Sequence, residues 1–200
     1  MRLFIFGIGQ ISEVAEFYFN KYCNFSEIFT VADESYLVGN TKPSTLSTGE
    51  AISLCDPEKD KWFVAMSYKR FNTPRKNKFQ ELKNLGMAFQ SFVHPSAHLW
   101  SDKIIGENCL ILENNVVQFG SFMGNNNIIW SNNHIGHHCK MGNHNFVSSG
   151  VIISGNVKVG DNVFFGVNST IIDGLDIGDY SWVGPGIIIK DNLTQKSRVT

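Results

Sequence analysis

The chain has 200 residues and a net charge of −1, from 17 basic and 18 acidic side chains. No run of lysine or arginine occurs, which argues against a nucleic-acid-binding surface. No apolar stretch reaches the ~20 residues that cross a bilayer, so we expect no membrane segment. The apolar start MRLFIFGIG stops at glycines and is typical of a buried strand rather than a signal peptide. The four cysteines form no CxxC pair, which favours reduced packing residues in a cytoplasmic protein.

The first residues predict the opening of a βαβ unit. Residues 2–8 read as a hydrophobic strand, and Ser12 can cap the helix that follows. The inward face of this helix is assigned to Val14, Phe17 and Tyr18. A glycine turn joins strand and helix and consists of Gly7, Ile8, Gly9 and Gln10.

A second strand at residues 27–32 ends in Asp33 and Glu34. A glycine turn aimed at a helix N-terminus is suited to phosphate, but the third glycine of the dinucleotide fingerprint is missing. The turn therefore either binds phosphate or only packs the helix on the strand.

Residues 41–60 are rich in turn formers and predict a loop with a short helix. A third strand follows at residues 61–67, then a helix from Thr73-Pro74 to Gly86 and a strand at residues 87–93. We expect residues 1–88 to form a small Rossmann-like domain of three or four strands.

From residue 93 onwards a large apolar residue recurs at every sixth position without a slip. The positions are Val93, Leu99, Ile105, Ile111, Val117, Met123, Ile129, Ile135, Met141, Val147, Ile153, Val159, Phe165, Ile171, Ile177, Val183 and Ile189. Hexads in groups of three describe a prism with one short strand on each face, and such coils bury their interior only by stacking. We expect residues 89–200 to form a parallel β-helix of about five coils with a short tail.

A period of eighteen residues accompanies the hexads. Residues that tolerate a left-handed backbone recur at that spacing, at Asn108, Asn126, His144, Asn162 and Tyr180. Cys109 and Cys139 lie two residues before inward hydrophobes, where small side chains fit below a corner.

Histidines cluster in the segment NNHIGHHCKMGNH. His137 lies two residues past the inward Ile135 and therefore at the rim of a coil, and Gly155 follows one coil later on the same edge. An imidazole about 4.8 Å from a bare backbone N–H is suited to acyl transfer. By the same register His144 stacks in the corner ladder and is structural, His134 lies on Val116 and Ile152, and His138 lies near the candidate site. Four polar histidines on a polar surface would give the same pattern.

Several motifs in order resemble the hexapeptide-repeat sugar acyltransferases of the NeuD/PglD family. They are the N-terminal GxGxxxE turn, the acidic pair, FVHPSA, IGHHCKMG, SGNVKVGDNVFFGVNSTI and VGPGIIIKD. The resemblance implies a homotrimer of left-handed β-helices with acetyl-CoA as co-substrate, no metal, and a nucleotide-linked amino sugar as acceptor. WSNNHIGHH and SYKRFNTPR are similar to the VioB-like branch, which acts on dTDP-4-amino-4,6-dideoxy sugars for surface polysaccharides.

The resemblance also implies roles for individual residues. His137 matches the catalytic base and Gly155 the glycine whose amide meets the thioester oxygen, with His138 and Asn133 as candidate support. The donor would contact Gly155, Asn156, Val167, Gly184 and Gly186. The nucleotide sugar would contact Gly7, Gly9, Gln10, Asp33, Glu34 and Arg75.

Three departures from the family pattern stand out. The residue after the catalytic histidine is usually acidic, and here it is His138. A second histidine of some members falls on Phe146, and no GxPAK-type tail precedes Thr200.

Three other functions are weighed against N-acetylation. O-acetylation of a sugar hydroxyl uses the same base. A zinc site of the γ-carbonic-anhydrase kind needs HxxxxH, but Cys139 stands five residues after His134. A binding or ice-structuring surface would need flat threonine ladders, and only Thr170 is present on such a face.

Overall fold

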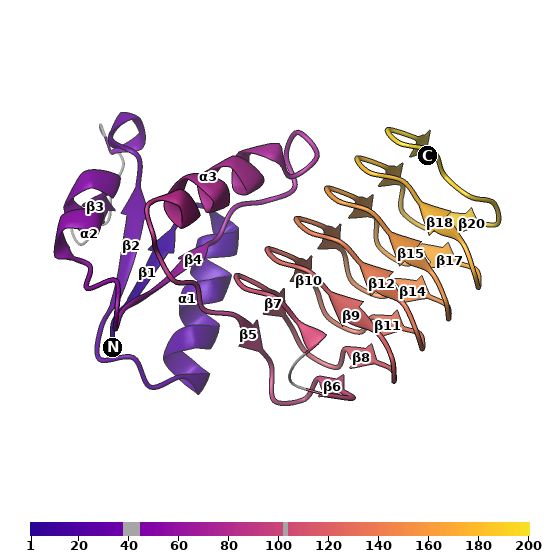
Figure 1. The fold of residues 1–200 in the computed structure, drawn as a ribbon, viewed down its shortest axis with the longest axis horizontal. Coiled ribbons are helices and arrows are strands. Elements are labelled where there is room, and N and C mark those ends of the chain that lie inside the picture. The colour runs from indigo at the N-terminus through magenta and orange to yellow at the C-terminus, as the bar shows by residue number, and fades with distance from the viewer. Residues whose placement is uncertain (38–44, 102–103) are drawn as a thin grey trace. The chain divides into compact units, whose positions relative to one another are not determined.

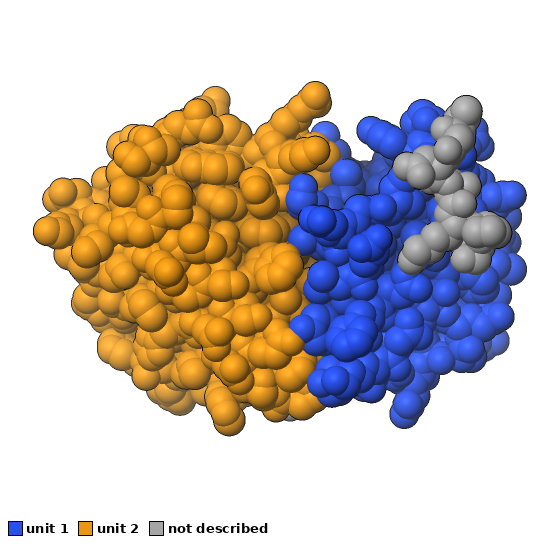
Figure 2. All heavy atoms as spheres, turned by 180° about the vertical axis from the view of Figure 1, so that it is seen from behind, with its two compact units in different colours: residues 1–67, 77–90 blue, residues 68–76, 91–200 orange. Residues whose placement is uncertain are grey.

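The computed structural model describes residues 1–37, 45–101 and 104–200. The chain divides into two compact units, residues 1–67 with 77–90 and residues 68–76 with 91–200 (Figure 2). The sequence predicted one boundary after residue 88. The two divisions differ in the segment 68–76, which belongs to the second unit, and in residues 89–90, which belong to the first.

The first unit is built on a four-stranded parallel sheet of order β3-β2-β1-β4 (Figure 1). Its elements are β1 (Leu3–Phe6), α1 (Gln10–Tyr22), β2 (Ile28–Ala32), the 3₁₀ helix η1 (Glu34–Tyr36), β3 (Leu46–Ser47), α2 (Thr48–Leu54), β4 (Lys61–Val64) and most of α3 (Thr73–Asn84). β1 lies between β2 and β4 and is buried throughout. The predicted strands at 2–8, 27–32 and 61–67 and the predicted helix from Thr73 are therefore present. Residues 41–44 of the predicted loop lie outside the described residues.

The turn after β1 depends on a glycine. Gly7 has a φ of +136°, and a Cβ at this position would lie 2.5 Å from the carbonyl oxygen of Ala65. Any side chain here would push the β1–α1 turn away from the strand β4.

Two details of α1 correct the sequence interpretation. The N-cap is Gly9, and Ser12 lies inside the helix with 2 % of its surface exposed. The buried face consists of Ser12, Ala15 and Phe19, whereas Phe17 is 55 % exposed. The helix carries aromatic residues on more than one face, so the aromatic positions alone do not identify the buried one.

The second unit is a parallel β-helix of two-residue strands (Figure 1). Its strands are β5 (Phe92–Val93), β6 (His98–Leu99), β7 (Leu110–Ile111), β8 (Val116–Val117), β9 (Phe122–Met123), β10 (Ile128–Ile129), β11 (His134–Ile135), β12 (Lys140–Met141), β13 (Phe146–Val147), β14 (Ile152–Ile153), β15 (Lys158–Val159), β16 (Phe164–Phe165), β17 (Thr170–Ile171), β18 (Asp176–Ile177), β19 (Trp182–Val183), β20 (Ile188–Ile189) and β21 (Arg198–Val199). They form a seven-stranded, a six-stranded and a four-stranded face. Hexapeptide repeats with this parallel pairing fit the left-handed form of the β-helix.

The predicted hydrophobic register is confirmed. All the apolar residues of the hexad series, from Val93 to Ile189, belong to one core that runs along the inside of the coils. Cys109 and Cys139 are also buried, as free thiols. Burial raises the pKa of the Cys109 thiol to about 11, so this thiol stays protonated and inert at neutral pH.

Each coil turns at three corners, and each corner carries a residue with positive φ. We name the corners after one member each. The 144 corner comprises Asn108, Asn126, His144, Asn162 and Tyr180; the 150 corner comprises Asn114, Asn132, Gly150, Asn168 and Gly186; and the 138 corner comprises Gly120, His138, Asn156 and Gly174. Asparagine and glycine predominate because they adopt the left-handed region at little cost. The predicted left-handed corner at the eighteen-residue period is thus confirmed.

The seven-stranded face is covered from outside by residues 68–76 of the same unit. The ring of Tyr68 lies 4.9 Å from Phe146, 4.7 Å from Phe164 and 6.0 Å from Trp182. Aromatic stacking of this kind adds to apolar burial. The segment that the sequence placed in the first domain therefore packs on the β-helix.

Candidate functional site

The ring of His137 lies directly against Gly155 of the next coil. A Cβ on Gly155 would lie 2.5 Å from Cε1 and 2.6 Å from Nε2 of His137. Only glycine leaves room for the imidazole at this point. The neighbours that the eighteen-residue register predicted are therefore in contact.

The backbone N–H of Gly155 has no acceptor within the described part of the chain. The N–H groups on both sides are paired, Ser154 with the carbonyl of Ile171 at 3.0 Å and Asn156 with the carbonyl of His137 at 2.8 Å. A buried N–H without a partner is rare and costs free energy. Beside an imidazole, such a donor can bind the oxyanion of an acyl-transfer intermediate.

His138 contacts His137 through the ring nitrogens. The two Nδ1 atoms lie 3.2 Å apart, at hydrogen-bond distance. Both side chains are exposed at the 138 corner, between the six-stranded and the four-stranded face. Of the two residues predicted to support His137, His138 is in position to do so.

Two residues of the site were not identified from the sequence. The Oε1 atom of Gln118 accepts the backbone N–H of His137 at 3.1 Å. The Oδ1 atom of Asp173 lies 2.8 Å from the position of a Gly155 Cβ, beside the His137 ring. Asp173 follows Gly155 by one coil, so the register could have located it. No motif pointed to either residue.

Exposed aromatic side chains continue from the site toward the N-terminal coils. Phe119 is 66 % exposed, and its ring lies 5.8 Å from that of His138 and 5.1 Å from that of Trp100. Trp100 also packs against Phe122 at 5.9 Å. These rings give the site one apolar flank.

Asn133 is a correction to the prediction. It is 2 % exposed, its Nδ2 donates to the carbonyl of Trp130, and its Oδ1 accepts the N–H of Val151 at 2.7 Å. Its side chain holds two coils together below the corner and does not reach His137. The position before a hexad strand is structural here.

The last strand pairs with Gly184. Its N–H donates to the carbonyl of Val199 at 2.7 Å, and a Cβ here would lie 3.1 Å from Cα of Thr200. A contact between Gly184 and the donor stays a prediction.

The other residues predicted to bind the donor lie on two different edges. Gly155 and Asn156 are at the 138 corner, whereas Gly186 and the 48 % exposed Val167 are at the 150 corner. The N–H of Gly186 donates to the carbonyl of Val167 at 2.8 Å, so these two are neighbours. The six-stranded face separates the two pairs within one chain.

In the first unit, the predicted nucleotide residues lie at the carboxyl ends of β1 and β2. Gly7, Gly9 and Gln10 lead into α1, and Asp33 and Glu34 follow β2. Oδ1 of Asp33 accepts hydrogen bonds from Thr48 at 2.8 Å and from Lys78 Nζ at 2.9 Å. Lys78 Nζ also lies 2.9 Å from Oε1 of Glu81, so two carboxylates balance its positive charge at this edge.

Arg75 is the second correction. It is fully buried, and its guanidinium donates to the carbonyls of His144 at 3.0 Å and Asn145 at 2.9 Å. Burial lowers the pKa of Arg75 to about 9, so the group remains charged at neutral pH. A side chain without exposed surface makes no contact with a nucleotide, and Arg75 instead ties residues 68–76 to the β-helix.

His144 is structural, as predicted. Its Nδ1 lies 2.8 Å from Nδ2 of Asn126, which can only donate, so Nδ1 accepts. Burial and the nearby Arg75 lower the pKa of His144 to about 4. The imidazole is therefore neutral at pH 7 and fixed in one tautomer.

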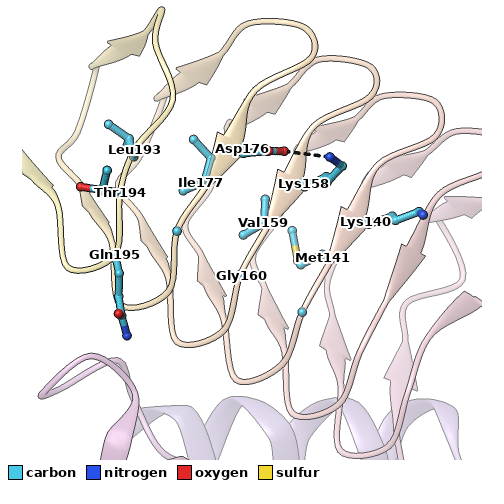
Figure 3. A pocket seen from close by; sticks show the side chains of 12 residues that line it. Lys140, Met141, Lys158, Val159, Gly160, Asp176, Ile177, Leu193, Thr194 and Gln195 are labelled. Atoms are coloured by element: carbon cyan, nitrogen blue, oxygen red, sulfur yellow. Dashed lines mark ion pairs between the residues drawn. The ribbon is translucent and has the colours of Figure 1, made fainter.

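A hollow of about 500 Å³ on the four-stranded face includes Lys140, Lys158 and Asp176 in its lining (Figure 3). Lys158 pairs with Asp176 at 3.3 Å. The hollow is open to solvent, and the charged residues in its lining are those of an exposed strand face. We therefore assign it no role.

In residues 1–37, 45–101 and 104–200, no three or more histidine, cysteine or acidic side chains are grouped so that they could hold a metal ion. No helix in these ranges is long and apolar enough to cross a membrane.

Comparison with known proteins first defines the class of fold. A family model described as the hexapeptide repeat of succinyl-transferase matches residues 156–191. No match was found among curated protein sequences. The matched residues contain the strands β15 to β20 of the β-helix, where the core repeats at every sixth position.

Solved structures then show where the whole fold recurs. The acetyltransferase domain of PglB from Neisseria gonorrhoeae, in complex with acetyl coenzyme A, is 22% identical with a TM-score of 0.87 over 99% of this chain and 95% of that one. PerB from Caulobacter crescentus, with CoA and GDP-perosamine, is 22% identical with a TM-score of 0.84 over 98% and 91%. WeeI from Acinetobacter baumannii is 16% identical with a TM-score of 0.83 over 100% and 97%. At these identities the comparison establishes a shared fold.

Proposed function

We propose that this protein is an acetyl-CoA-dependent N-acetyltransferase that acts on the amino group of a nucleotide-linked amino sugar. The observation that carries the proposal is the contact between His137 and Gly155, whose N–H is unpaired in the described part of the chain. Similar structures bound to acetyl-CoA, or to CoA with GDP-perosamine, support the choice of donor and of acceptor class.

The chemistry requires one base and one oxyanion donor. The neutral amine attacks the thioester carbon, and Nε2 of His137 removes the proton as the N–C bond forms. The Gly155 N–H stabilises the negative charge on the carbonyl oxygen. When the C–S bond breaks, the thiolate of CoA takes the proton from His137, and the site returns to its starting state.

The first unit would bind the nucleotide. The open helix N-terminus after Gly9 suits a diphosphate, and Asp33 or Glu34 suits a ribose hydroxyl or a base N–H. Replacing Asp33→Ala should raise KM for the sugar nucleotide about tenfold, about 1.4 kcal/mol, and leave KM for acetyl-CoA nearly unchanged. An equal rise in both would assign Asp33 to folding through its bond with Lys78.

The donor site would be shared between copies of the chain. Gly155 and Val167 lie at opposite edges of the six-stranded face, where Ile152 and Ile188 are 39 % and 57 % exposed. An edge of one copy can meet the other edge of the next in a closed ring, and we propose a homotrimer. Light scattering that gave a monomer of 22.4 kDa at assay concentration would contradict this arrangement.

A mixing experiment tests the shared site more sharply. His137→Asn and Val167→Glu should each inactivate the protein, because they change different edges. Unfolding and refolding the two variants together should restore part of the activity, since some sites then combine two intact edges. Activity that stays absent in mixed oligomers would place both residues in a site within one chain.

The function itself is tested by release of free thiol from acetyl-CoA with dTDP-, GDP- and UDP-linked amino sugars. We expect one 4-amino-4,6-dideoxy sugar, on dTDP, to give the highest kcat/KM. Acetylation of a sugar that carries only hydroxyl groups, at a comparable rate, would replace N-acetylation by O-acetylation. No thiol release with any acceptor would reject the proposal.

A further inference from the structure

His138 occupies the position directly after the candidate base, and its ring is held in place from three sides. Its Nδ1 lies 3.2 Å from Nδ1 of His137. Its ring fills the space above Gly120, where a Cβ would lie 2.7 Å from Cδ2 of His138. The Phe119 ring packs against it with an angle of 80° between the two ring planes.

Backbone hydrogen bonds also hold both histidines in place. The N–H of His138 donates to the carbonyl of Phe119 at 3.0 Å, and the carbonyl of His137 accepts from Asn156 at 2.8 Å. His138 has a φ of +57°, as its corner requires. Each imidazole thus rests on a glycine of a neighbouring coil, His137 on Gly155 and His138 on Gly120.

We infer that His138 is a positioning residue that accepts the Nδ1–H of His137 and so keeps Nε2 of His137 free to act as the base. The inference rests on the proposed function for its catalytic meaning. A hydrogen bond between two Nδ1 atoms needs one protonated and one bare nitrogen. If His137 carries its proton on Nδ1, Nε2 has the lone pair that the reaction needs, on the side of Gly155.

The same bond stabilises the imidazolium formed when the acceptor amine loses its proton. No atom is consumed, because the Nε2 proton leaves with the CoA thiolate. The support comes from a neutral ring, so it disappears once His138 is itself protonated. Both rings must be neutral for this step, so the rate should fall when either imidazole takes up a proton.

Other charges around the pair come from neighbouring coils. Asp173 faces the His137 ring from the coil beyond Gly155. Gln118 and Asn156, above and below, are neutral, and Lys140 and Lys158 point outward on the next face. Cys139 is buried and its pKa is raised by burial, so it carries no charge at neutral pH. Asp173→Asn is therefore the control that separates a general effect of charge from the contact between the rings.

Residues at the equivalent positions of the 138 corner indicate which substitutions of His138 should fold. Asparagine and glycine occupy the equivalent left-handed positions at 156, 120 and 174, so His138→Asn and His138→Gly should fold. An aspartate places a charged acceptor near Nδ1 of His137. The matched control His98→Asn changes an exposed histidine two coils away from His134.

We expect His138→Gly to lower kcat about 10- to 100-fold with both KM values unchanged. His138→Asn should retain part of kcat and shift the acid limb of the rate to lower pH, because only one imidazole can then take up a proton. His138→Asp should shift that limb to higher pH by about one unit or more, since a negative charge favours the imidazolium. His98→Asn should change none of these.

The hydrogen bond between His137 and His138 can also be measured without substrate. In protein labelled with ¹⁵N-histidine, Nδ1 of His137 should give the shift of a protonated nitrogen and Nε2 that of a bare one, and His138→Gly should abolish this preference. The opposite tautomer of His137, or an acid limb unchanged in His138→Asn and His138→Asp, would overturn the inference. The proposed function fails separately, if the wild type acetylates no nucleotide amino sugar.

Discussion

The 144 corner and the 138 corner have the same backbone and both carry a histidine, yet the two imidazoles differ in every other respect. His144 is 5 % exposed and accepts a hydrogen bond from the asparagine of the coil before it. His138 is exposed and lies over a glycine, with a second histidine as its partner. The residue eighteen positions earlier in the chain decides the difference. Asn126 supplies a side chain that bonds to His144, whereas Gly120 has no side chain and the ring of His138 lies over it. In a β-helix a residue is therefore interpreted through its neighbours one coil away.

The largest expected effect separates the two corners by rate. His137→Asn removes the base but keeps a side chain of similar size, so kcat/KM should fall by about 10²–10⁴. His144→Asn places at its corner the residue type of Asn108, Asn126 and Asn162, and should leave the rate within about twofold. Calorimetric binding of CoA by His137→Asn, unchanged from the wild type, would show that the site remains assembled. A His137→Asn variant with more than half the wild-type rate would exclude His137 as the base.

The second effect is a pH dependence of stability at the 144 corner. The pKa of His144 is about 4 in the folded protein and 6.5 for the free group. The unfolded chain therefore binds the extra proton first, and the free energy of unfolding should fall as the pH drops from 6.5 to 4, by up to about 3 kcal/mol for each chain. Urea unfolding of the wild type and of His144→Asn at pH 7 and pH 4.5 would measure it. An equal loss in both proteins would assign the effect to other groups.

The last prediction compares the same substitution, asparagine to glycine, at both corners. Asn126→Gly removes buried hydrogen bonds to His144 at 2.8 Å and from Asn108 at 2.8 Å, and should cost about 2–4 kcal/mol. Asn156→Gly, at the exposed corner, loses only a 3.5 Å contact with Asp173. The entropic cost of glycine, about 0.4–1 kcal/mol, is common to both. Equal destabilisation of the two variants would show that the asparagine ladder contributes nothing specific.

The regular part of this protein could be predicted from the sequence because burial follows the hexads directly. The residues from Val93 to Ile189 needed only their spacing, and the pairing of His137 with Gly155 followed from the register. Asn133 was misassigned because a motif match does not show which backbone groups of the next coil a side chain binds. Arg75 was misassigned because its segment packs on the β-helix more than sixty residues further along the chain.

In the first unit, Ser12 took the inward place that aromatic residues were expected to fill. A hydroxyl within a helix can be buried where the space is small, and Gly7 leaves such a space, with Cβ of Ser12 3.6 Å from the position of a Gly7 Cβ. Hydrophobic periodicity does not detect a contact of this kind.

Regular coils of eighteen residues each add the same length to the β-helix. Positions eighteen residues apart lie one strand spacing apart, about 4.8 Å. An inserted or deleted coil beyond Asp173 would therefore keep every face and corner in register, as repeats that contact only their neighbours allow. The distance from the His137 ring to the last coil would change in steps of that size. The length of an extended molecule bound along the coils could thus be set by the number of coils, without any change in the residues that react.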